Sequence, residues 1–309
     1  MYKPYGIIPP IITPFREDGT VDYDSLAKMS IYLVEHGVHG LFPFGTTGEF
    51  YAVNDEEYVK ALQTVRDAVA GRKDRFGNPI QLLAGCSHIT TRGVIRLIRL
   101  VEQVGGYDAV SVLTPMFISQ TQDELYHYYK DIAASTSLPV IMYNNKPKTN
   151  ISIAPETVAR LVRDCPNIIA VKDSTGDMTN CEEYLRLTAE QRDHFNVMMG
   201  RDTMIYAGLS YGCSGAVASC ANVAPRIVAD IYDKYVDGDL EGALQAQYRL
   251  APLRIATAMG TFPEVIKEGL NLLGIPVGKC LDPIRELKPE EKEKLRRILE
   301  EMGLIEAQE

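Results

Sequence analysis

Hydrophobic and polar positions divide the chain into two kinds of segment that alternate along its length. Short runs of β-branched and apolar residues have the length of buried strands, and longer segments between them repeat their apolar residues with helical spacing. Strands that alternate with helices in this way build βα units around a parallel sheet. The pattern predicts eight strands, at residues 7–13, 40–43, 80–85, 109–113, 139–143, 168–172, 196–200 and 215–219.

The helical segments lie between these strands and carry start signals of their own. Asn54 precedes three acidic residues, and Pro155 stands at a first helical position, where its missing N–H costs nothing. Eight units over about 240 residues match the size of a (β/α)8 barrel, so we predict an α/β protein built on a TIM barrel. The predicted helices cover residues 22–36, 55–70, 91–104, 122–135, 155–164, 178–191, 203–211 and 225–237.

The last part of the chain keeps the helical spacing but adds no strand pattern. Helices are predicted at 240–257, 263–273 and 288–302, and the last of them has acidic residues early and basic residues late. No Gly/Ser-rich or Pro-rich linker separates this part from the barrel. We therefore expect a (β/α)8 catalytic domain at 1–238 and a C-terminal helical extension at 239–309, packed on the outer helices.

Composition and charge restrict the partners of the protein. Apolar residues make up 46% and charged residues 24% of the chain, as is normal for a globular protein, and the formal net charge of −9 argues against a nucleic-acid surface. Prolines interrupt the N-terminal segment where a signal peptide needs a continuous apolar helix. Nowhere do the roughly 18 consecutive apolar residues of a membrane helix occur. We expect a cytoplasmic protein that acts on a small molecule, without nucleic-acid or membrane partners.

Cysteine and histidine positions favour structural roles. The six cysteines form no CxxC pair and have no histidine at ligand spacing, so they are interpreted as small buried hydrophobes, and no metal site is expected. His36 and His39 form the only close histidine pair, near the end of a predicted helix and without a carboxylate at metal-site spacing. We interpret both as turn residues.

Candidate reactive residues fall at the carboxyl ends of predicted strands, where a (β/α)8 barrel carries its active site. Lys172 ends the apolar run 168–172, and Tyr143 ends the preceding strand. Burial disfavours the charged form of lysine, so Lys172 is either paired, poorly buried or held neutral as a nucleophile. Thr46 and Thr47 lie in a Gly-Thr-Thr-Gly-Glu turn directly after the second strand.

Each of these features alone has a structural explanation, but together they form a consistent chemical set. A strand-end lysine or tyrosine commonly reaches solvent, and a glycine-threonine turn commonly satisfies its own backbone. In combination, the turn supplies neutral donors for a carboxylate, the tyrosine relays a proton, and a neutral lysine forms a Schiff base with a ketone. The set suits formation or cleavage of a carbon–carbon bond next to a 2-keto acid.

Three motifs in this order and spacing resemble the dihydrodipicolinate synthase / N-acetylneuraminate lyase family of pyruvate-dependent Schiff-base aldolases. They are GTTGE at 45–49, YNN at 143–145 and IIAVKDSTGD at 168–177, and the resemblance runs from Gly6 to about Leu304. It implies a (β/α)8 barrel with a helical C-terminal extension, no metal, no cofactor beyond the Schiff base on the lysine, and a homotetramer.

The resemblance also implies roles for individual residues. Lys172 matches the Schiff-base lysine, and Tyr143 matches the proton-shuttling tyrosine. Thr46 and Thr47 match residues that grip the pyruvate carboxylate and connect to the tyrosine, so Thr47 is assigned to catalysis as well as to binding. Val217 matches a strand-eight position whose backbone carbonyl faces the bound keto acid.

Other positions depart from the family pattern or match only part of it. Phe117 stands where the synthases have a tyrosine that crosses a subunit interface into the proton relay, and a phenyl ring passes no proton. Lys148 occupies the position of an arginine that receives the second substrate's carboxylate. Asp202 keeps one acid of the lyases' sugar-contacting stretch, and Ser219 matches a serine that holds the sugar chain.

The first expectation is a class I aldolase, a lyase that makes or cleaves a 2-keto-3-deoxy sugar acid. One alternative is 4-hydroxy-tetrahydrodipicolinate synthase, which joins pyruvate to aspartate semialdehyde, and another is a dehydratase of a keto-deoxy acid. A third alternative, from a different class, is a non-catalytic sensor that binds 2-keto acids. The polar residues expected at the mouth of the site are Asn144, Asn145, Lys148, Arg201, Asp202 and Ser219.

Overall fold

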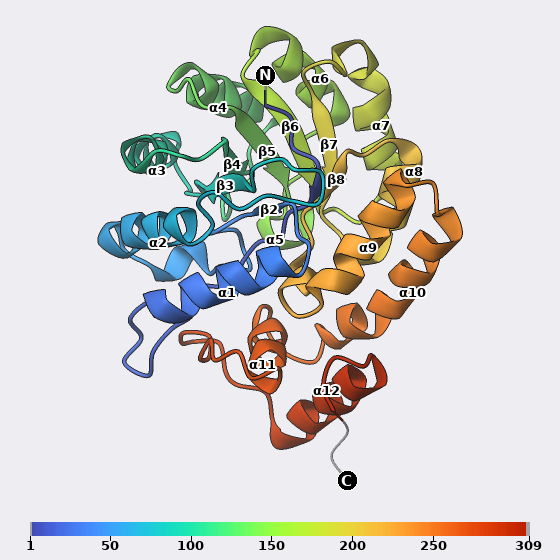
Figure 1. Cartoon of the computed structure of the whole chain (residues 1–309). Coiled ribbons are helices and arrows are strands. Elements are labelled where there is room, and N and C mark those ends of the chain that lie inside the picture. Colours follow the sequence, from blue (N-terminus) through green and yellow to red (C-terminus); the bar gives the residue numbers. More distant parts are fainter. Residues whose placement is uncertain (1, 307–309) are drawn as a thin grey trace.

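The computed structural model describes residues 2–306, and its centre is a single sheet of eight parallel strands in the order β1-β8-β7-β6-β5-β4-β3-β2. A parallel bridge between Pro10 and Phe42, with a hydrogen bond from Ile11 N to Phe42 O of 3.0 Å, joins the segment after β1 to the end of β2. The sheet thus curves into a nearly closed ring, and the predicted TIM barrel is confirmed (Figure 1). The strands are β1 (Gly6–Ile7), β2 (Gly40–Leu41), β3 (Gln81–Gly85), β4 (Ala109–Leu113), β5 (Val140–Asn144), β6 (Ile168–Asp173), β7 (Asn196–Met199) and β8 (Gly215–Ala216).

Helices surround the strands on the outside of the barrel (Figure 1). Asn54 caps one of them with a capping box, because its side chain accepts from Glu57 N while the Glu57 side chain accepts from Asn54 N. A short helix, α5 (Lys146–Thr149), was not predicted, since its four residues are too few to show a periodic pattern. The barrel helices are α1 (Tyr23–Glu35), α2 (Asp55–Ala68), α3 (Thr91–Val104), α4 (Gln122–Ala134), α6 (Pro155–Asp164), α7 (Met178–Leu187), α8 (Ile205–Tyr211) and α9 (Pro225–Val236).

The first and last strands are shorter than the sequence pattern predicts. Pro9 and Pro10 lack a backbone N–H, so the apolar run that begins at β1 stays buried but does not extend the regular ladder. After β8 the chain turns into a 3₁₀ helix, η4 (Ser219–Asn222), so Ser219 lies on a helical turn and not in a strand as expected. Both irregular segments lie at the end of the barrel where the strands finish.

The hydrophobic core has two layers. The larger layer lies between the strands and the surrounding helices. The smaller one fills the barrel interior with side chains from all eight strand segments, as is usual for closed (β/α)8 barrels, and it consists of Ile8, Phe42, Leu83, Ala109, Ile141, Ile169, Ala170, Met198 and Val217. This filled interior forms a floor beneath the carboxyl ends of the strands, so a ligand can enter only from above it.

The C-terminal part is helical, as predicted, and lies on one side of the barrel. Its helices are α10 (Leu240–Ala256), α11 (Glu264–Leu272) and α12 (Pro289–Glu301). Figure 1 shows α10 running beside α9, with α11 and α12 below α1 and α9. We propose a domain boundary between α9 and α10, at residues 238 and 239.

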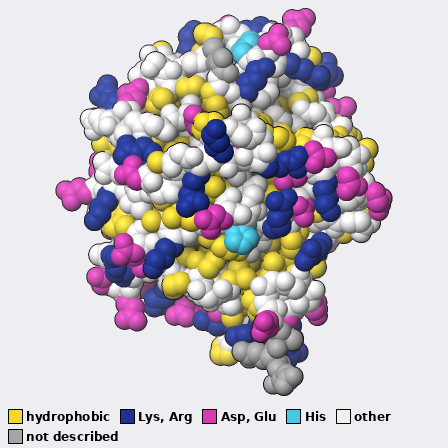
Figure 2. Space-filling view, in the orientation of Figure 1, with side chains coloured by type: hydrophobic (Ala, Val, Ile, Leu, Met, Phe, Trp, Pro, Cys, Tyr) yellow, Lys and Arg dark blue, Asp and Glu magenta, His cyan; other side chains and the backbone are white. Residues whose placement is uncertain are grey.

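The face drawn in Figure 2 carries basic and acidic side chains interspersed over its surface.

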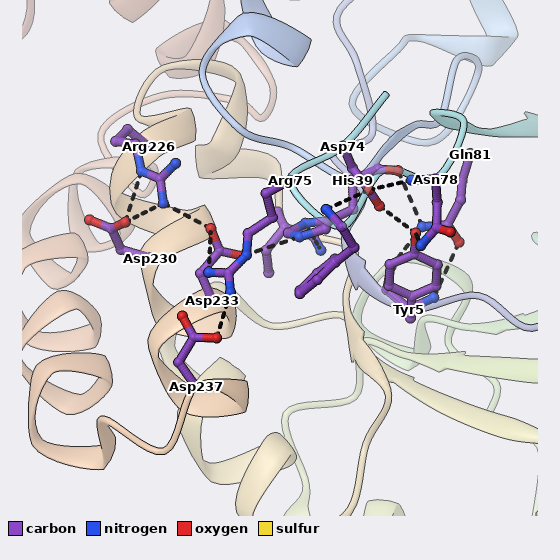
Figure 3. A network of polar contacts seen from close by, with 12 residues as sticks. Tyr5, His39, Asp74, Arg75, Asn78, Gln81, Arg226, Asp230, Asp233 and Asp237 are labelled. Atoms are coloured by element: carbon purple, nitrogen blue, oxygen red, sulfur yellow. Dashed lines mark hydrogen bonds and ion pairs between the residues drawn. The ribbon is translucent and has the colours of Figure 1, made fainter. Parts of the chain in front are cut away.

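A network of polar side chains with buried His39 and Asp233 at its centre lies at the opposite end of the barrel, where the strands begin (Figure 3). His39 Nδ1 accepts a hydrogen bond from Ile7 N at 3.1 Å, so the hydrogen of the neutral ring lies on Nε2, which is 3.1 Å from Asp233 Oδ1. Arg226 donates to the other oxygen of Asp233 at 2.8 Å. His39 lies in the bend between α1 and β2, in agreement with its interpretation as a turn residue, but it is also buried against a carboxylate from α9, which the sequence did not indicate. His36 does end α1 and is exposed.

The cysteine prediction is confirmed, since all six cysteines are free and buried. Cys181 and Cys213 have their sulfur atoms 3.5 Å apart without a disulfide. None of the helices within residues 2–306 combines the length and apolar character needed to cross a bilayer.

Candidate active site

A cavity of about 220 Å³ opens at the carboxyl ends of the strands. It is smaller than the ~300 Å³ at which pockets for drug-sized ligands begin, so it suits small acids. The structure brings together in its wall most of the site residues predicted from the sequence: Thr46, Thr47, Tyr143, Asn145, Lys148, Lys172, Arg201, Asp202, Val217 and Ser219. The wall also contains Arg254, Thr257 and Phe262, which come from the C-terminal extension and were not predicted.

Lys172 lies at the end of β6, directly beside Tyr143 of β5 in the sheet register. Its side chain is only 3% exposed, and its Nζ lies 3.7 Å from the centre of the Tyr143 ring and 5.2 Å from that of Phe42. Burial lowers the pKa of Lys172 below its usual range, although the neighbouring Tyr143 opposes this shift. The lysine is therefore placed and tuned as an amine nucleophile.

Tyr143 is the centre of a small hydrogen-bonded group. Its hydroxyl accepts a hydrogen bond from Asn145 Nδ2 at 2.8 Å and lies 3.4 Å from Thr46 Oγ1. Burial alone raises the pKa of Tyr143, but the charge of Lys172 and the hydrogen bond to Thr46 outweigh it and lower the pKa. A phenol with a lowered pKa beside a buried amine can accept and return a proton during catalysis.

The turn that carries Thr46 and Thr47 has a constrained backbone. Phe44 and Glu49, on either side of it, have positive φ angles of 59° and 49°. Gly48 packs so closely that a Cβ there would lie 2.8 Å from Ile11 O, so only glycine fits. The turn thereby presents Thr47 as a buried residue of the cavity wall.

The far end of this turn is held by a buried ion pair that sequence reasoning missed. Glu49 and Lys267 of α11 are both fully buried, with Lys267 Nζ 2.7 Å from Glu49 Oε1. Lys267 also donates to Lys279 O at 3.0 Å, and Glu49 Oε2 accepts from Leu281 N at 3.2 Å. The C-terminal extension therefore anchors the threonine turn, which no local sequence pattern indicates.

Asp202 is buried in the cavity wall and holds several neighbours. Its Oδ1 accepts from Cys220 N at 2.7 Å, and its Oδ2 accepts from Ser219 Oγ at 3.2 Å. Arg254 of α10 lies with Nε 3.6 Å from Oδ2 of the same carboxylate. Asp202 and Ser219 therefore form a fixed polar corner, and the cations Lys148, Arg201 and Arg254 border the cavity around it.

One residue expected at the mouth of the site lies elsewhere. Asn144 is the neighbour of Tyr143 on a strand, so it faces the opposite way, and its Nδ2 donates to Tyr184 OH at 2.8 Å outside the cavity. The placement of Asn144 at the mouth is therefore wrong. Phe117, in the loop after β4, is 94% exposed with a φ of 74° and is not part of this chain's cavity wall.

The donor groups of the site are suited to organic acids. Within residues 2–306 no group of three or more His, Cys, Asp or Glu side chains is arranged to bind a metal ion. The cavity combines a buried amine, a phenol of lowered pKa, threonine hydroxyls and cations at its border. Such an arrangement can bind a keto acid and activate it through an imine.

Comparisons with known proteins agree on one family. The family model described as "Dihydrodipicolinate synthetase family" matches residues 3–302. A 4-hydroxy-tetrahydrodipicolinate synthase from Archaeoglobus fulgidus is 33% identical over 300 residues, which cover 97% of this chain and 99% of that protein. The structure of dihydrodipicolinate synthase from Thermotoga maritima superposes with a TM-score of 0.92 at 30% identity, covering 98% of this chain and 100% of the other. A monomeric dihydrodipicolinate synthase variant superposes with a TM-score of 0.91 at 30% identity, covering 97% of each chain.

Proposed function

Because this chain belongs to the dihydrodipicolinate synthetase family, we propose that it is a 4-hydroxy-tetrahydrodipicolinate synthase that condenses pyruvate with aspartate semialdehyde. The protein is a pyruvate-dependent aldolase of this family, and thus a lyase. A 2-keto-3-deoxy sugar acid was the first expectation from the sequence. The names of the relatives support the alternative, the synthase, and give no support to the sugar acid.

The observation that carries the proposal is a buried lysine beside a tyrosine in a cavity bordered by cations. Lys172 attacks the keto carbon of pyruvate, water leaves, and an iminium ion forms. Loss of a methyl proton then gives an enamine, which attacks the aldehyde carbon of the second substrate. The amine of that substrate finally attacks the iminium carbon and expels Lys172, which closes the ring and restores the enzyme.

The other residues of the cavity have supporting roles in this proposal. Thr46 and Thr47 hold the pyruvate carboxylate through neutral donors, and Thr47 takes part in catalysis by keeping pyruvate in line with the amine. Tyr143 carries protons to and from the reacting atoms, and Asn145 holds its hydroxyl. The backbone carbonyl of Val217 faces the bound keto acid.

The second substrate lies toward the mouth of the cavity in this proposal. Lys148, Asp202 and Ser219 border that region and contact its polar groups. No cofactor is required, because the imine on the lysine supplies the electron sink. We also propose a cytoplasmic homotetramer, while one similar synthase is a monomeric variant.

Borohydride trapping and a comparison of aldehydes test the proposal. With pyruvate present, borohydride should reduce the imine and leave one stable adduct on Lys172, detected by peptide mass spectrometry. The K172A variant should give no adduct. A synthase should then turn over aspartate semialdehyde at least about 100-fold better than glyceraldehyde, since a bound carboxylate contributes that factor or more.

The outcomes separate the alternatives. An adduct together with better turnover of glyceraldehyde, or of 2-keto-3-deoxy sugar acids in the cleavage direction, would replace the synthase by a sugar-acid aldolase. Protein that binds pyruvate but gives no adduct on Lys172 would be the non-catalytic sensor. A keto-deoxy acid that loses water without releasing pyruvate would indicate the dehydratase.

A further inference from the structure

We propose that Arg254, on helix α10 of the C-terminal extension, is the receptor for the carboxylate of the aldehyde substrate. The inference rests on the proposed function, because it assigns the second-substrate subsite of the same cavity. It places substrate selection outside the barrel that carries the chemistry. The starting observation is that Arg254 lines the cavity together with Lys172 although it lies in a different part of the chain.

The guanidinium of Arg254 is held in a fixed position. Its Nε lies 3.6 Å from Asp202 Oδ2, and its Nη1 donates to Thr257 Oγ1. Thr257 in turn donates to the backbone carbonyl of Arg254 at 2.7 Å. Asp202 and Thr257 are both buried, so the two groups that orient the guanidinium are themselves rigid.

Asp202 is fixed from several sides, which makes it a positioning residue for Arg254. Its carboxylate accepts from Cys220 N at 2.7 Å, and its backbone carbonyl accepts from Gln247 Nε2 at 2.8 Å. Gln247 lies on α10, the same helix as Arg254. The helix is therefore attached to the site at two points, and the side chain of Arg254 cannot turn away without breaking the contact to Asp202.

Part of the guanidinium remains available for a ligand. Within residues 2–306, Nη1 of Arg254 donates to Thr257 and Nε lies in ion-pair range of Asp202, whereas Nη2 has no hydrogen-bond partner. The side chain is 25% exposed and belongs to the cavity wall, so part of it is accessible to a ligand. An arginine with a free edge in a largely buried setting is a preferred partner for a carboxylate, and its planar geometry selects that group.

Lys148 is the competing receptor, and the geometry favours Arg254 over it. Lys148 is exposed on the four-residue helix α5, and its Nζ lies 5.8 Å from the ring centre of Phe262. An exposed lysine is a mobile point charge that solvent screens. Its role in this proposal is to attract the anion, while Arg254 fixes the orientation of the bound aldehyde.

The experiment compares acidic and neutral aldehydes in variants of Arg254. We would measure kcat and KM for aspartate semialdehyde, succinic semialdehyde and glyceraldehyde in the wild type and in R254Q, R254K and K148Q. R254Q should raise KM for both acidic aldehydes by about 10- to 100-fold, the range of a charge-assisted hydrogen bond, with kcat/KM for glyceraldehyde changed by less than about threefold. The KM of R254K for the acidic aldehydes should lie between those of the wild type and R254Q, because lysine keeps the positive charge but lacks the two-pronged geometry of the guanidinium.

A matched control lies on the same helix. Arg249 is exposed, lies outside the cavity wall and donates to Met302 O at 3.0 Å. The variant R249Q removes the same charge from α10 and should leave the selectivity between aldehydes unchanged. Borohydride trapping of pyruvate in each variant shows whether its Schiff-base site is intact.

Three results would overturn the inference. The first is an R254Q variant that keeps the wild-type ratio of kcat/KM for acidic over neutral aldehydes, together with a K148Q variant that loses this preference. That result would make Lys148 the receptor. The second is an equal fall in kcat/KM for all three aldehydes in R254Q, which would make Arg254 a structural residue only. The third is a wild type that traps pyruvate but prefers glyceraldehyde to both acidic aldehydes. A wild type without a trapped adduct would instead overturn the proposed function itself.

Discussion

Two polar clusters, each with a buried titratable side chain at its centre, lie at opposite ends of the same barrel, and they differ in how completely the charge of that side chain is paired. At the end where the strands begin, Asp233 lies within 3.1 Å of His39 and 2.8 Å of Arg226, and Arg75 approaches it as well (Figure 3). At the other end, Lys172 is equally buried but forms no ion pair with any carboxylate of the described residues.

The difference separates stability from reactivity. A buried charge with partners contributes a fixed structure, and a change of its protonation is opposed by those partners. A buried amine without a carboxylate keeps a lowered pKa and is available as a nucleophile. Burial alone therefore does not identify a functional residue. The presence or absence of charged partners around the buried group distinguishes a structural residue from a reactive one.

The largest expected effect comes from Lys172→Ala. Turnover should fall by at least about 10³-fold, because the imine cannot form without the amine. The melting temperature should stay the same or rise, since the substitution removes a buried amine that no carboxylate pairs. Steady-state kinetics and thermal unfolding of the same preparation check both statements. A strong loss of stability would contradict the contrast between the two clusters.

The next largest effect comes from Lys267→Met, which leaves Glu49 buried without its partner. Breaking a buried ion pair from one side destabilises a protein by about 3–5 kcal/mol. The affinity for pyruvate should fall as well, because Glu49 ends the turn of Thr46 and Thr47. Denaturant unfolding and the concentration of pyruvate needed for half-maximal borohydride trapping measure the two effects.

The double variant E49Q/K267M is the matched control for this pair. It removes both charges, so it should recover a large part of the stability lost in the single variant. If the single variant were as stable as the wild type, the ion pair would not anchor the turn.

At the opposite end of the barrel, Asp233→Asn should lower stability by about 1–3 kcal/mol and leave kcat unchanged. His39, Arg226 and Arg75 together lower the pKa of Asp233, although burial raises it. A carboxyl group whose folded pKa lies below its unfolded value of about 3.9 stabilises the fold above that pH. This contribution is lost as the pH falls through the folded pKa.

The pH dependence provides the control for that prediction. The wild type should lose stability below about pH 4 more steeply than D233N, because the variant has no carboxylate to protonate at this position. Denaturant titrations at several pH values between about 2 and 7 measure the slopes. Parallel curves for the two proteins would show that Asp233 contributes no pH-dependent stability.

The smallest effect is expected for Asn145→Ala. The side chain of Asn145 donates to Tyr143 OH and thus favours the phenolate form. Without it, the pKa of Tyr143 should rise, and the midpoint at which kcat/KM for pyruvate increases with pH should move to higher pH. The rate itself should fall by about 3- to 10-fold, as for the loss of one hydrogen bond. An unchanged pH profile would assign Asn145 to binding only.

Much of the fold and of the candidate site follows from the sequence, for physical reasons that also explain the failures. Buried strands and amphipathic helices produce periods that a sequence shows directly. Parallel strands of a barrel finish at one end, so residues that follow separate strands converge there, as Thr46, Tyr143 and Lys172 do. These predictions depend only on local patterns and on the count of units.

The features that could not be predicted depend on contacts between distant segments. Glu49 meets Lys267, His39 meets Asp233, and Arg254 meets Asp202 only after the helices have packed. Each residue is an ordinary charged or polar position in its own segment, so no period or motif marks it.

The ion pair between Glu49 and Lys267 also predicts an order of events during protein synthesis. A nascent chain that has emerged only through α9 contains every strand of the barrel and its reactive lysine, but Glu49 has no cation to neutralise it. The threonine turn can settle only after α11 has left the ribosome and docked. Affinity for pyruvate is therefore expected to appear only once α11 has docked on the barrel.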